Sequence, residues 1–349
     1  MPSTNLHLRY VKENLSRGNL KNLFMFSSRE ILLKSGTNRY SPLFPHRLFI
    51  ECTSRCNLKC KMCPRRMSSI KVSNSDLPFE VMKSWINQLP YTSIVDLTGL
   101  GEPLILNDVF DRISFVKSSG KICTLFSNGT LMSEEKSKKL LLSKLDQLSF
   151  SIDSPDPKTY SKIRVGATLE NVIGNISKLV KLRDKSKSDL ILNVNMVVMK
   201  QNLNQMSRMV EICNEMGLDY VNFSDLNYQL NMHIDQNLKK ESIRNLERKT
   251  IEKAFKTAKD RAAECGIRAF FPRIERGKPH NYFCRQPFRM IVVTLEGNIR
   301  PCCGVHNYHV GNAYKEKLMD IWNGKKYVKF RKNLDSDNPP LFCRECHSF

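Results

Sequence analysis

Six short runs rich in β-branched and aromatic residues recur along the first two thirds of the chain, and helical segments separate most of them. Strands that alternate with helices are typical of βα units, which build a parallel sheet. Six such units predict an α/β fold with a partial (β/α)6, TIM-like barrel. The predicted strands are residues 48–53, 93–99, 121–129, 145–153, 190–199 and 220–225.

Helical spacing of apolar residues predicts three of the connecting helices, within residues 77–89, 107–120 and 169–182. The second is expected to begin at a capping Asn107 and to end before Gly120. In barrels of this kind, reactive side chains gather where the strands end. The unusual residues of this chain follow its first four predicted strands, so we expect the functional site there.

Three regions differ along the 349 residues. Residues 1–45 are basic and weakly periodic, and we expect an N-terminal extension to which the sequence assigns no structure. Residues 46–270 hold the predicted barrel. The regular alternation stops at about residue 271, and residues 271–349 hold five of the twelve cysteines. We therefore expect a small C-terminal domain in that last region.

Composition limits the functional classes. The chain has no run of 18 apolar residues and no hydrophobic signal segment, so we expect no membrane span and no secretion. The predicted location is the cytoplasm, where cysteines serve as thiols or ligands rather than disulfides. The net charge of +22 permits an acidic substrate, an acidic partner protein or nucleic acid. No nucleic-acid-binding motif accompanies that charge, so nucleic acid is the least expected partner.

Three cysteines, Cys56, Cys60 and Cys63, follow the first predicted strand in a C-x3-C-x2-C pattern. Thiolates at this spacing can wrap a short loop around a metal centre. A structural zinc site closes with four ligands, and the nearby Cys52 falls within the strand pattern. Three ligands leave one metal position open, as a catalytic centre requires. A zinc knuckle or a set of buried thiols is the alternative.

In the form CNLKCKMC after a first strand, this pattern resembles the signature of the radical S-adenosylmethionine (SAM) superfamily. The resemblance implies that the three cysteines hold a 4Fe–4S cluster whose fourth iron binds SAM. The runs TGLGEP, SNGT, SID and YSKIRVGATLENVIGNI match further family segments in order, although Leu100 replaces one family glycine. The resemblance implies SAM-binding positions at Gly101, Glu102, Pro103, Asn128, Ser151, Asp153 and Arg164.

Two of these positions are charged. Glu102 and Arg164 would orient SAM by charge-assisted hydrogen bonds. Taken alone the Gly-Glu-Pro sequence is a weak signal, because a carboxylate such as Glu102 is also common at the start of a helix.

A second group of cysteines lies in the C-terminal region. The run FCRQPFRMIVVTLEGNIRPCCGV predicts a β-hairpin that turns at residues 296–298. Cys284 and Cys302 in this run, with Cys343 and Cys346 further downstream, supply four thiols. Four thiols form a closed set, for which zinc is the ordinary expectation. Together with VGNAYKEKLMDIWNGKKYVKFRKNL, however, the segment resembles the SPASM/twitch extension of radical SAM enzymes, which combines a β-hairpin with a helix.

The number of cysteines indicates how many auxiliary clusters to expect. A full SPASM domain has a longer central run of cysteines, whereas this chain has only CREC there. Its spacing is similar to the butirosin aminocyclitol dehydrogenase type, whose twitch domain binds a single auxiliary cluster. We expect one auxiliary 4Fe–4S cluster, with an electron-transfer role, on Cys284, Cys302, Cys343 and Cys346. Cys303 is the alternative to Cys302, because neighbours on a strand face opposite ways.

The other cysteines, Cys52, Cys123, Cys213 and Cys265, are expected to be buried thiols. One of them, or Cys303, is a candidate hydrogen-atom donor to a substrate radical. His280, His306, His309 and His347 flank the second group, and we expect them at the surface or behind the ligands rather than on the metal.

The resemblance implies cleavage of SAM to methionine and a 5′-deoxyadenosyl radical, which removes a hydrogen atom from the substrate. We expect oxidation or epimerisation of a small carbohydrate- or aminocyclitol-like substrate, because 45 residues before the barrel are too few for a peptide leader-binding domain. A peptide- or protein-modifying maturase is the alternative enzyme, and a zinc-stapled basic binding protein is the non-enzyme alternative. The expected protein partner is a small acidic electron donor such as flavodoxin or ferredoxin.

Overall fold

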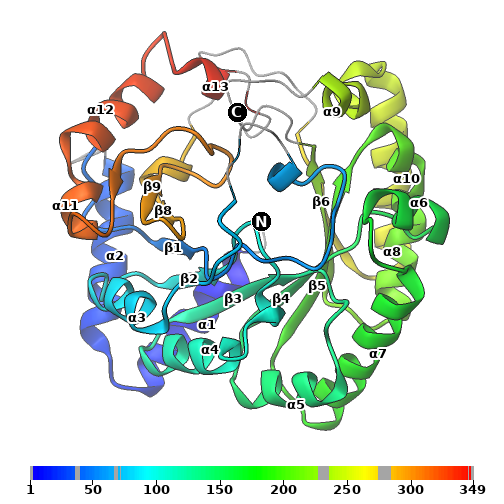
Figure 1. Cartoon of the computed structure of the whole chain (residues 1–349), viewed down its shortest axis with the longest axis horizontal. Helices are drawn as coiled ribbons and strands as arrows, with labels where there is room; N and C mark the ends of the chain where they lie inside the picture. The colour runs from blue at the N-terminus through cyan, green and yellow to red at the C-terminus, as the bar shows by residue number, and fades with distance from the viewer. Residues whose placement is uncertain are drawn as a thin grey trace.

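The computed structural model describes residues 3–35, 40–66, 70, 72–226, 236–273, 284–344 and 346. Within these ranges one open sheet of ten strands has the order β10-β9-β8-β1-β2-β3-β4-β5-β6-β7. Strands from β8 across to β7 pair in parallel, whereas β9 is antiparallel to both of its neighbours. Helices surround the curved sheet on its outer side (Figure 1).

The strands are β1 (Arg47–Ile50), β2 (Ile94–Leu97), β3 (Ile122–Ser127), β4 (Gln147–Ser151), β5 (Ile191–Val198), β6 (Tyr220–Asp225), β7 (Arg268–Phe270), β8 (Met290–Val293), β9 (Asn298–Arg300) and β10 (Gly311–Asn312). The α-helices are α1 (Ser3–Ser16), α2 (Leu20–Ser35), α3 (Phe79–Asn87), α4 (Val109–Ser118), α5 (Glu134–Leu142), α6 (Pro157–Ile163), α7 (Leu169–Lys185), α8 (Met206–Glu215), α9 (Gln236–Glu241), α10 (Arg248–Cys265), α11 (Leu318–Trp322), α12 (Lys325–Leu334) and α13 (Leu341–Arg344).

The six predicted strands are present as β1–β6, and the open α/β barrel is confirmed. The predicted C-terminal hairpin is also present, as β8 and β9. Gly297 has a φ of 75° in its turn, a conformation that glycine adopts without strain. Nothing in the sequence indicated that β8 pairs in parallel with β1, so that the hairpin extends the sheet of the barrel. The domain boundaries near residues 45 and 270 stay predictions.

The three predicted helices correspond to α3, α4 and α7, but the expected cap of α4 is wrong. Asp108, not Asn107, is at the N-cap, and its side chain makes no capping hydrogen bond. Its carboxylate instead accepts two hydrogen bonds from Arg112, at 2.9 and 2.8 Å. Gly120, with a φ of 72°, follows the end of the helix as expected.

The N-terminal region forms two helices, α1 and α2, which lie across the N-terminal ends of the strands. Leu6 and Tyr10 pack against Ile94 and Ile122, the first residues of β2 and β3. These helices lie behind the strands in Figure 1. They leave the opposite ends of the strands available for the functional site.

Polar residues on the inward face explain why these two helices escaped prediction. Asn14 is fully buried and donates to the carbonyl of Gly120 at 3.3 Å. Arg29 is fully buried as well, and it donates to the carbonyls of Phe44 and Phe288, each at 2.9 Å. Because these contacts replace apolar ones, the hydrophobic periodicity is weak where the helices meet the barrel.

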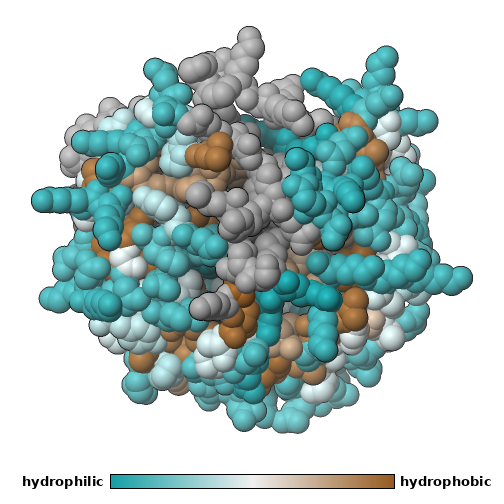
Figure 2. Space-filling model, turned by 45° about the horizontal axis from the view of Figure 1, so that its top comes forward, coloured by the Kyte–Doolittle hydropathy of each residue, from teal (hydrophilic) through white to brown (hydrophobic). Residues whose placement is uncertain are grey.

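All twelve cysteines are free thiols, as expected for thiols or ligands. None of the helices in the described ranges is long and apolar enough to span a membrane. The face turned toward the viewer in Figure 2 is mostly hydrophilic, with small separate hydrophobic areas.

Candidate active site

The loop after β1 holds three of the predicted ligands, Cys56, Cys60 and Cys63. Two backbone hydrogen bonds of 2.9 Å join the loop to residues 163–165 at the end of α6. Cys60 is buried and the other two are half-buried. Burial raises the pKa of Cys56 and of Cys63, and the charge of neighbouring thiols adds to the effect. Such thiols need a bound cation to become thiolates, so their donor chemistry fits a metal centre.

The turn after β2 approaches this cysteine loop closely. The backbone N–H of Glu102 donates to the carbonyl of Arg55 at 2.8 Å. A β-carbon at Gly101 would lie 2.6 Å from that same carbonyl oxygen and still closer to the carbonyl oxygen of Thr53. Both atoms belong to the backbone, so only glycine fits at this contact without moving the loop.

The carboxylate of Glu102 is buried and joins two strand ends. It accepts hydrogen bonds from the backbone N–H of Leu104 at 3.1 Å, the Ser127 hydroxyl at 2.8 Å and the backbone N–H of Asn128 at 2.7 Å. Burial raises the pKa of Glu102, against the effect of these donors. Pro103 is the first residue of the short 3-10 helix that Glu102 caps. The alternative role of Glu102 at a helix start is therefore confirmed, and its role toward SAM stays a prediction.

Asn128, after β3, contacts the cysteine loop directly. Its side-chain amide donates to the side-chain oxygen of Asn57 at 3.0 Å, and its own oxygen accepts from the backbone N–H of Thr130 at 3.0 Å. Asn57 is the neighbour of Cys56 in the chain. The third predicted motif thus lies beside the first.

Asp153 and Arg164 form a buried ion pair over the same loop. Nη1 of Arg164 lies 3.6 Å from the sulfur of Cys60, and Asp153 also accepts from the backbone N–H of Val197 at 2.8 Å. Burial lowers the pKa of Arg164, but the charge of Asp153 more than reverses this, so the guanidinium is charged. Ser151 is the last residue of β4, two positions before Asp153.

The four predicted auxiliary ligands, Cys284, Cys302, Cys343 and Cys346, lie in three parts of the C-terminal region: before β8, after β9, and in and after α13. Burial raises the pKa of Cys302 well above its ordinary value, and the charges of the other three thiols raise it further. Burial and the charge of Cys346 raise the pKa of Cys284 to about 12. Cys303 contributes to the pKa shifts of both Cys302 and Cys284 as well, so these effects do not separate the four predicted ligands from the fifth cysteine of the region.

Cys303 is exposed, whereas Cys302 is half-buried. Arg300 and Arg47 lie close enough to Cys303 to act on its thiol electrostatically. The arrangement favours Cys302 as the ligand, although the assignment stays a prediction. No three of the described His, Cys, Asp and Glu side chains form a group that could hold a single metal ion. The assignment of both cysteine sets as cluster ligands therefore rests on their sulfur chemistry and on their spacing in the sequence, and it stays a prediction.

Of the four remaining cysteines, all expected to be buried thiols, three are buried and one is half-buried. Cys123 and Cys213 are fully buried, and Cys265 is half-buried at the end of α10. Cys52 is buried just after β1 rather than within it, and its sulfur lies 3.8 Å from that of Met82. These thiols belong to the core, and none of them lines the cavity described next.

A cavity of about 460 Å³ lies between the cysteine loop, the turn after β2 and the β8–β9 hairpin. Its wall includes Ser54 of the loop, Leu100 of the turn and Arg300, which is two residues before Cys302. The cavity is therefore lined by parts of the two chain segments that carry Cys56 and Cys302, although no cysteine lines it. Its polar wall consists of Glu51, Ser54, Thr294, Glu296, Asn298, Arg300, His306, Asn307 and His309.

The sequence motifs did not identify the charged residues of this wall as site residues. Glu51 is buried; its carboxylate accepts from the backbone N–H of Leu100 at 2.7 Å and of Leu295 at 3.3 Å. Burial raises the pKa of Glu51. In the structure Glu51 directly follows β1, whereas the predicted strand 48–53 included it, so no sequence signal marked it as a site residue.

The histidines near the second cysteine group are only partly within the described residues. Nδ1 of His306 lies 2.6 Å from Nη1 of Arg300 and accepts its hydrogen bond. Burial and the charge of Arg300 lower the pKa of His306 to about 3. His309 is exposed, while His280 and His347 lie outside the described residues. His309 thus lies at the surface as expected, whereas a position of His306 behind the cluster ligands stays a prediction.

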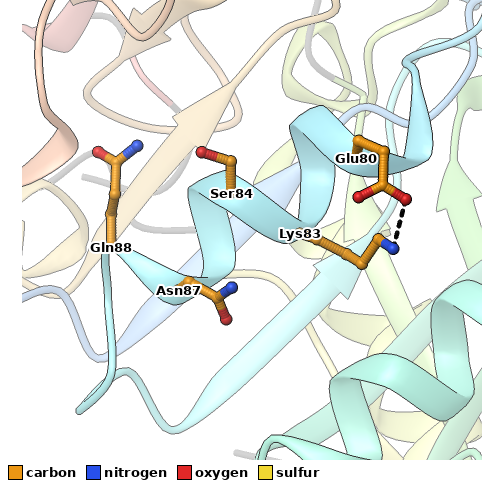
Figure 3. A pocket seen from close by; sticks show the side chains of 5 residues that line it. All are labelled: Glu80, Lys83, Ser84, Asn87 and Gln88. Carbon is orange, nitrogen blue, oxygen red and sulfur yellow. Dashed lines mark ion pairs between the residues drawn. The ribbon is translucent and has the colours of Figure 1, made fainter.

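A second hollow lies on the outer face of α3 and is separate from the strand ends (Figure 3). Its lining consists of Glu80, Lys83, Ser84, Asn87 and Gln88, with an ion pair between the first two. None of the predicted site residues lines it, so we assign it no part in the chemistry.

Two family models match the chain, and they match its two cysteine-bearing regions. The model of the radical SAM superfamily matches residues 50–213, and that of the SPASM iron–sulfur cluster-binding domain matches residues 284–347. The chain is a radical SAM enzyme with a SPASM domain. Its cofactors are SAM, the 4Fe–4S cluster that binds SAM and an auxiliary 4Fe–4S cluster.

Relatives of this radical SAM protein differ in what they act on. It is 25% identical over 307 residues to the tungsten-containing aldehyde ferredoxin oxidoreductase cofactor-modifying protein of Pyrococcus furiosus, covering 81% of this chain and 82% of that one. The structure of Streptococcus suis SuiB bound to precursor peptide SuiA has a TM-score of 0.67 at 17% identity, covering 90% and 73% of the two chains. The structure of BtrN in complex with AdoMet and 2-DOIA has a TM-score of 0.51 at 16% identity, covering 88% of this chain and 94% of that one. At these identities the two structures show the fold alone.

Proposed function

We propose that this radical SAM enzyme oxidises or epimerises a small carbohydrate- or aminocyclitol-like substrate held in the cavity beside Glu51 and Arg300. The observation that carries the proposal is the polar wall of that cavity, which adjoins the loop of Cys56 at one side and the chain segment of Cys302 at the other. Its volume of about 460 Å³ is within the range of small-molecule sites. Carboxylates, amides and hydroxyls in one wall suit a ligand with several hydroxyl groups.

The residues of the chain would hold the cofactors in defined places. Cys56, Cys60 and Cys63 would hold the SAM-binding cluster, while Cys284, Cys302, Cys343 and Cys346 would hold the auxiliary one. When bound, these groups supply the one-electron chemistry, including the 5′-deoxyadenosyl radical that removes a substrate hydrogen atom. The three-way contact of Asp153, Arg164 and the Cys60 loop fixes the loop relative to the ends of β4 and β5.

Glu51 is a candidate proton acceptor for oxidation at a carbinol carbon. Loss of a hydrogen atom and an electron from such a carbon also requires the hydroxyl proton to leave. The Glu51 carboxylate lines the cavity, and its burial, which raises its pKa, favours holding that proton. Two backbone N–H donors, of Leu100 and Leu295, fix its orientation.

A direct experiment is anaerobic turnover with SAM, dithionite and a panel of sugars and aminocyclitols. The proposal predicts 5′-deoxyadenosine in amounts that follow product formation. Oxidation would give a carbonyl product, whereas epimerisation in D₂O would place deuterium at the product carbon. Selective turnover of a peptide panel, with no response to small polyols, would replace this proposal by the maturase alternative.

Two further predictions about the setting of the reaction remain proposals. A small acidic electron donor such as flavodoxin or ferredoxin would be attracted by the net charge of +22, most strongly at low salt. The cytoplasm, which keeps thiols reduced, suits a chain whose twelve cysteines are all free.

A further inference from the structure

The cavity contains a buried cation that has no carboxylate partner among the described residues. Arg300 is 5% exposed and lines the cavity. Its guanidinium makes one hydrogen bond, from Nη1 to Nδ1 of His306, and its buried Nε has no hydrogen-bond partner. A guanidinium removed from water without a counterion or a full set of acceptors is costly to maintain.

The nearest carboxylates do not satisfy this guanidinium. The Glu51 carboxylate accepts from two backbone N–H groups instead, and Glu296 accepts from the hydroxyl of Thr294 at 2.9 Å. Glu51, the thiols of Cys303 and Cys302, and Glu296 act on Arg300 electrostatically, and no ion pair joins Arg300 to a carboxylate among the described residues. Among the described residues that line the cavity, the guanidinium of Arg300 is thus able to bind a ligand. The carboxylates of Glu51 and Glu296, in contrast, already accept hydrogen bonds from other groups.

His306 adds a second donor of fixed direction. Because its Nδ1 accepts from Arg300, the proton of the neutral ring is on Nε2. A neutral imidazole beside a charged guanidinium presents donors only at its far side. The pair is therefore arranged as a donor site for an anionic group, with Glu51 and Glu296 placed to accept from hydroxyls.

We propose that the substrate carries an anionic group, a carboxylate or a phosphate, and that Arg300 recognises it as the specificity-determining residue of the cavity. This inference rests on the proposed function and narrows it to a sugar acid or a sugar phosphate. The planar guanidinium would bind two oxygens of such a group at once. Neutral polyols would leave its charge unpaired and would bind more weakly.

The test measures binding without turnover, on the anaerobically reconstituted protein with both clusters. Thermal unfolding is followed with increasing glucuronate, glucose 6-phosphate or neutral glucose. Saturable stabilisation by glucuronate or by glucose 6-phosphate, but not by glucose, is expected, and the probe that stabilises more identifies carboxylate or phosphate. At about ten times its Kd, the stabilising probe should raise the folded-to-unfolded ratio about tenfold.

Three variants make the result specific. Arg300→Gln should abolish the response, and Arg300→Lys should keep part of it because the charge remains while the planar fork is lost. The charge-matched control Arg208→Gln changes an exposed arginine on α8 and should respond like the wild type. Equal responses to glucose and the anionic sugars, no response to either anion, or an unchanged response of Arg300→Gln would each overturn the proposal.

Failure here is distinguishable from failure of the proposed function. With SAM and dithionite alone, the wild type and the control Arg208→Gln should form 5′-deoxyadenosine and should retain their iron. A protein that makes 5′-deoxyadenosine but ignores the anionic probes refutes only the role of Arg300.

Discussion

Gly101 is the residue at which the smallest change should have the largest effect on the site. In Gly101→Ala the new methyl group would lie 2.6 Å from the carbonyl oxygen of Arg55 and still closer to that of Thr53. Ordinary contact begins at about 3.4 Å, so the backbone that leads to Cys56 must move by nearly an ångström. A misplacement of that size at reacting groups can cost about 100-fold in rate.

The assay is the initial rate of 5′-deoxyadenosine formation, together with iron content and the midpoint of thermal unfolding. The matched control is Gly174→Ala, because Gly174 is inside α7 with nothing within 4 Å of the added carbon. That control should be active and more stable by about 0.5–1 kcal/mol, as expected for alanine in a helix. Wild-type rate and wild-type iron in Gly101→Ala would refute the close contact between the two loops.

Three further outcomes follow from buried charges. Asp153→Ala should lower the free energy of unfolding by roughly 3–5 kcal/mol in denaturant titrations, because Arg164 would stay buried without its partner. The double variant Asp153→Ala/Arg164→Met should recover part of the lost stability. Equal losses of stability in the single and the double variant would contradict this reasoning. Glu51→Gln should slow product formation while SAM cleavage continues, and loss of both activities in parallel would instead indicate a structural role. His306, whose folded pKa of about 3 is below its ordinary value of about 6.5, binds more protons when unfolded, so its contribution to stability is lost as pH falls from about 6.5 toward 3. Urea titrations at several pH values should therefore show a smaller acid-side slope for His306→Asn than for the wild type, and identical slopes would disprove this assignment.

Local patterns predicted the parts of the site that depend on neighbours in the chain. The alternation of strands and helices places Cys56, Cys60 and Cys63 after one strand and Gly101 after the next strand. The structure then brings these segments into contact through the Arg55 and Asn57 hydrogen bonds. Their convergence could be expected because parallel strands end at the same edge of a sheet.

The features that were not predicted depend on contacts between distant segments. The pairing of β8 with β1 joins residues more than 240 positions apart, and only that pairing places Arg300 beside Glu51. The N-terminal helices were missed because Asn14 and Arg29, both polar, occupy their inward faces. The predicted cap at Asn107 was wrong because propensity alone could not choose between two adjacent capping residues, Asn107 and Asp108.

We expect the cysteines to act as two separate sets, each of which holds its own cluster. Iron and zinc should be measured on anaerobically reconstituted protein, on Cys56→Ala/Cys60→Ala/Cys63→Ala, and on Cys284→Ala/Cys302→Ala/Cys343→Ala/Cys346→Ala. The account predicts about eight irons for the wild type and about four for each variant, since each 4Fe–4S cluster depends on its own thiolates. Only the first variant should lose 5′-deoxyadenosine formation completely. A colourless protein with stoichiometric zinc, or 5′-deoxyadenosine formation that survives loss of Cys56, Cys60 and Cys63, would contradict the account.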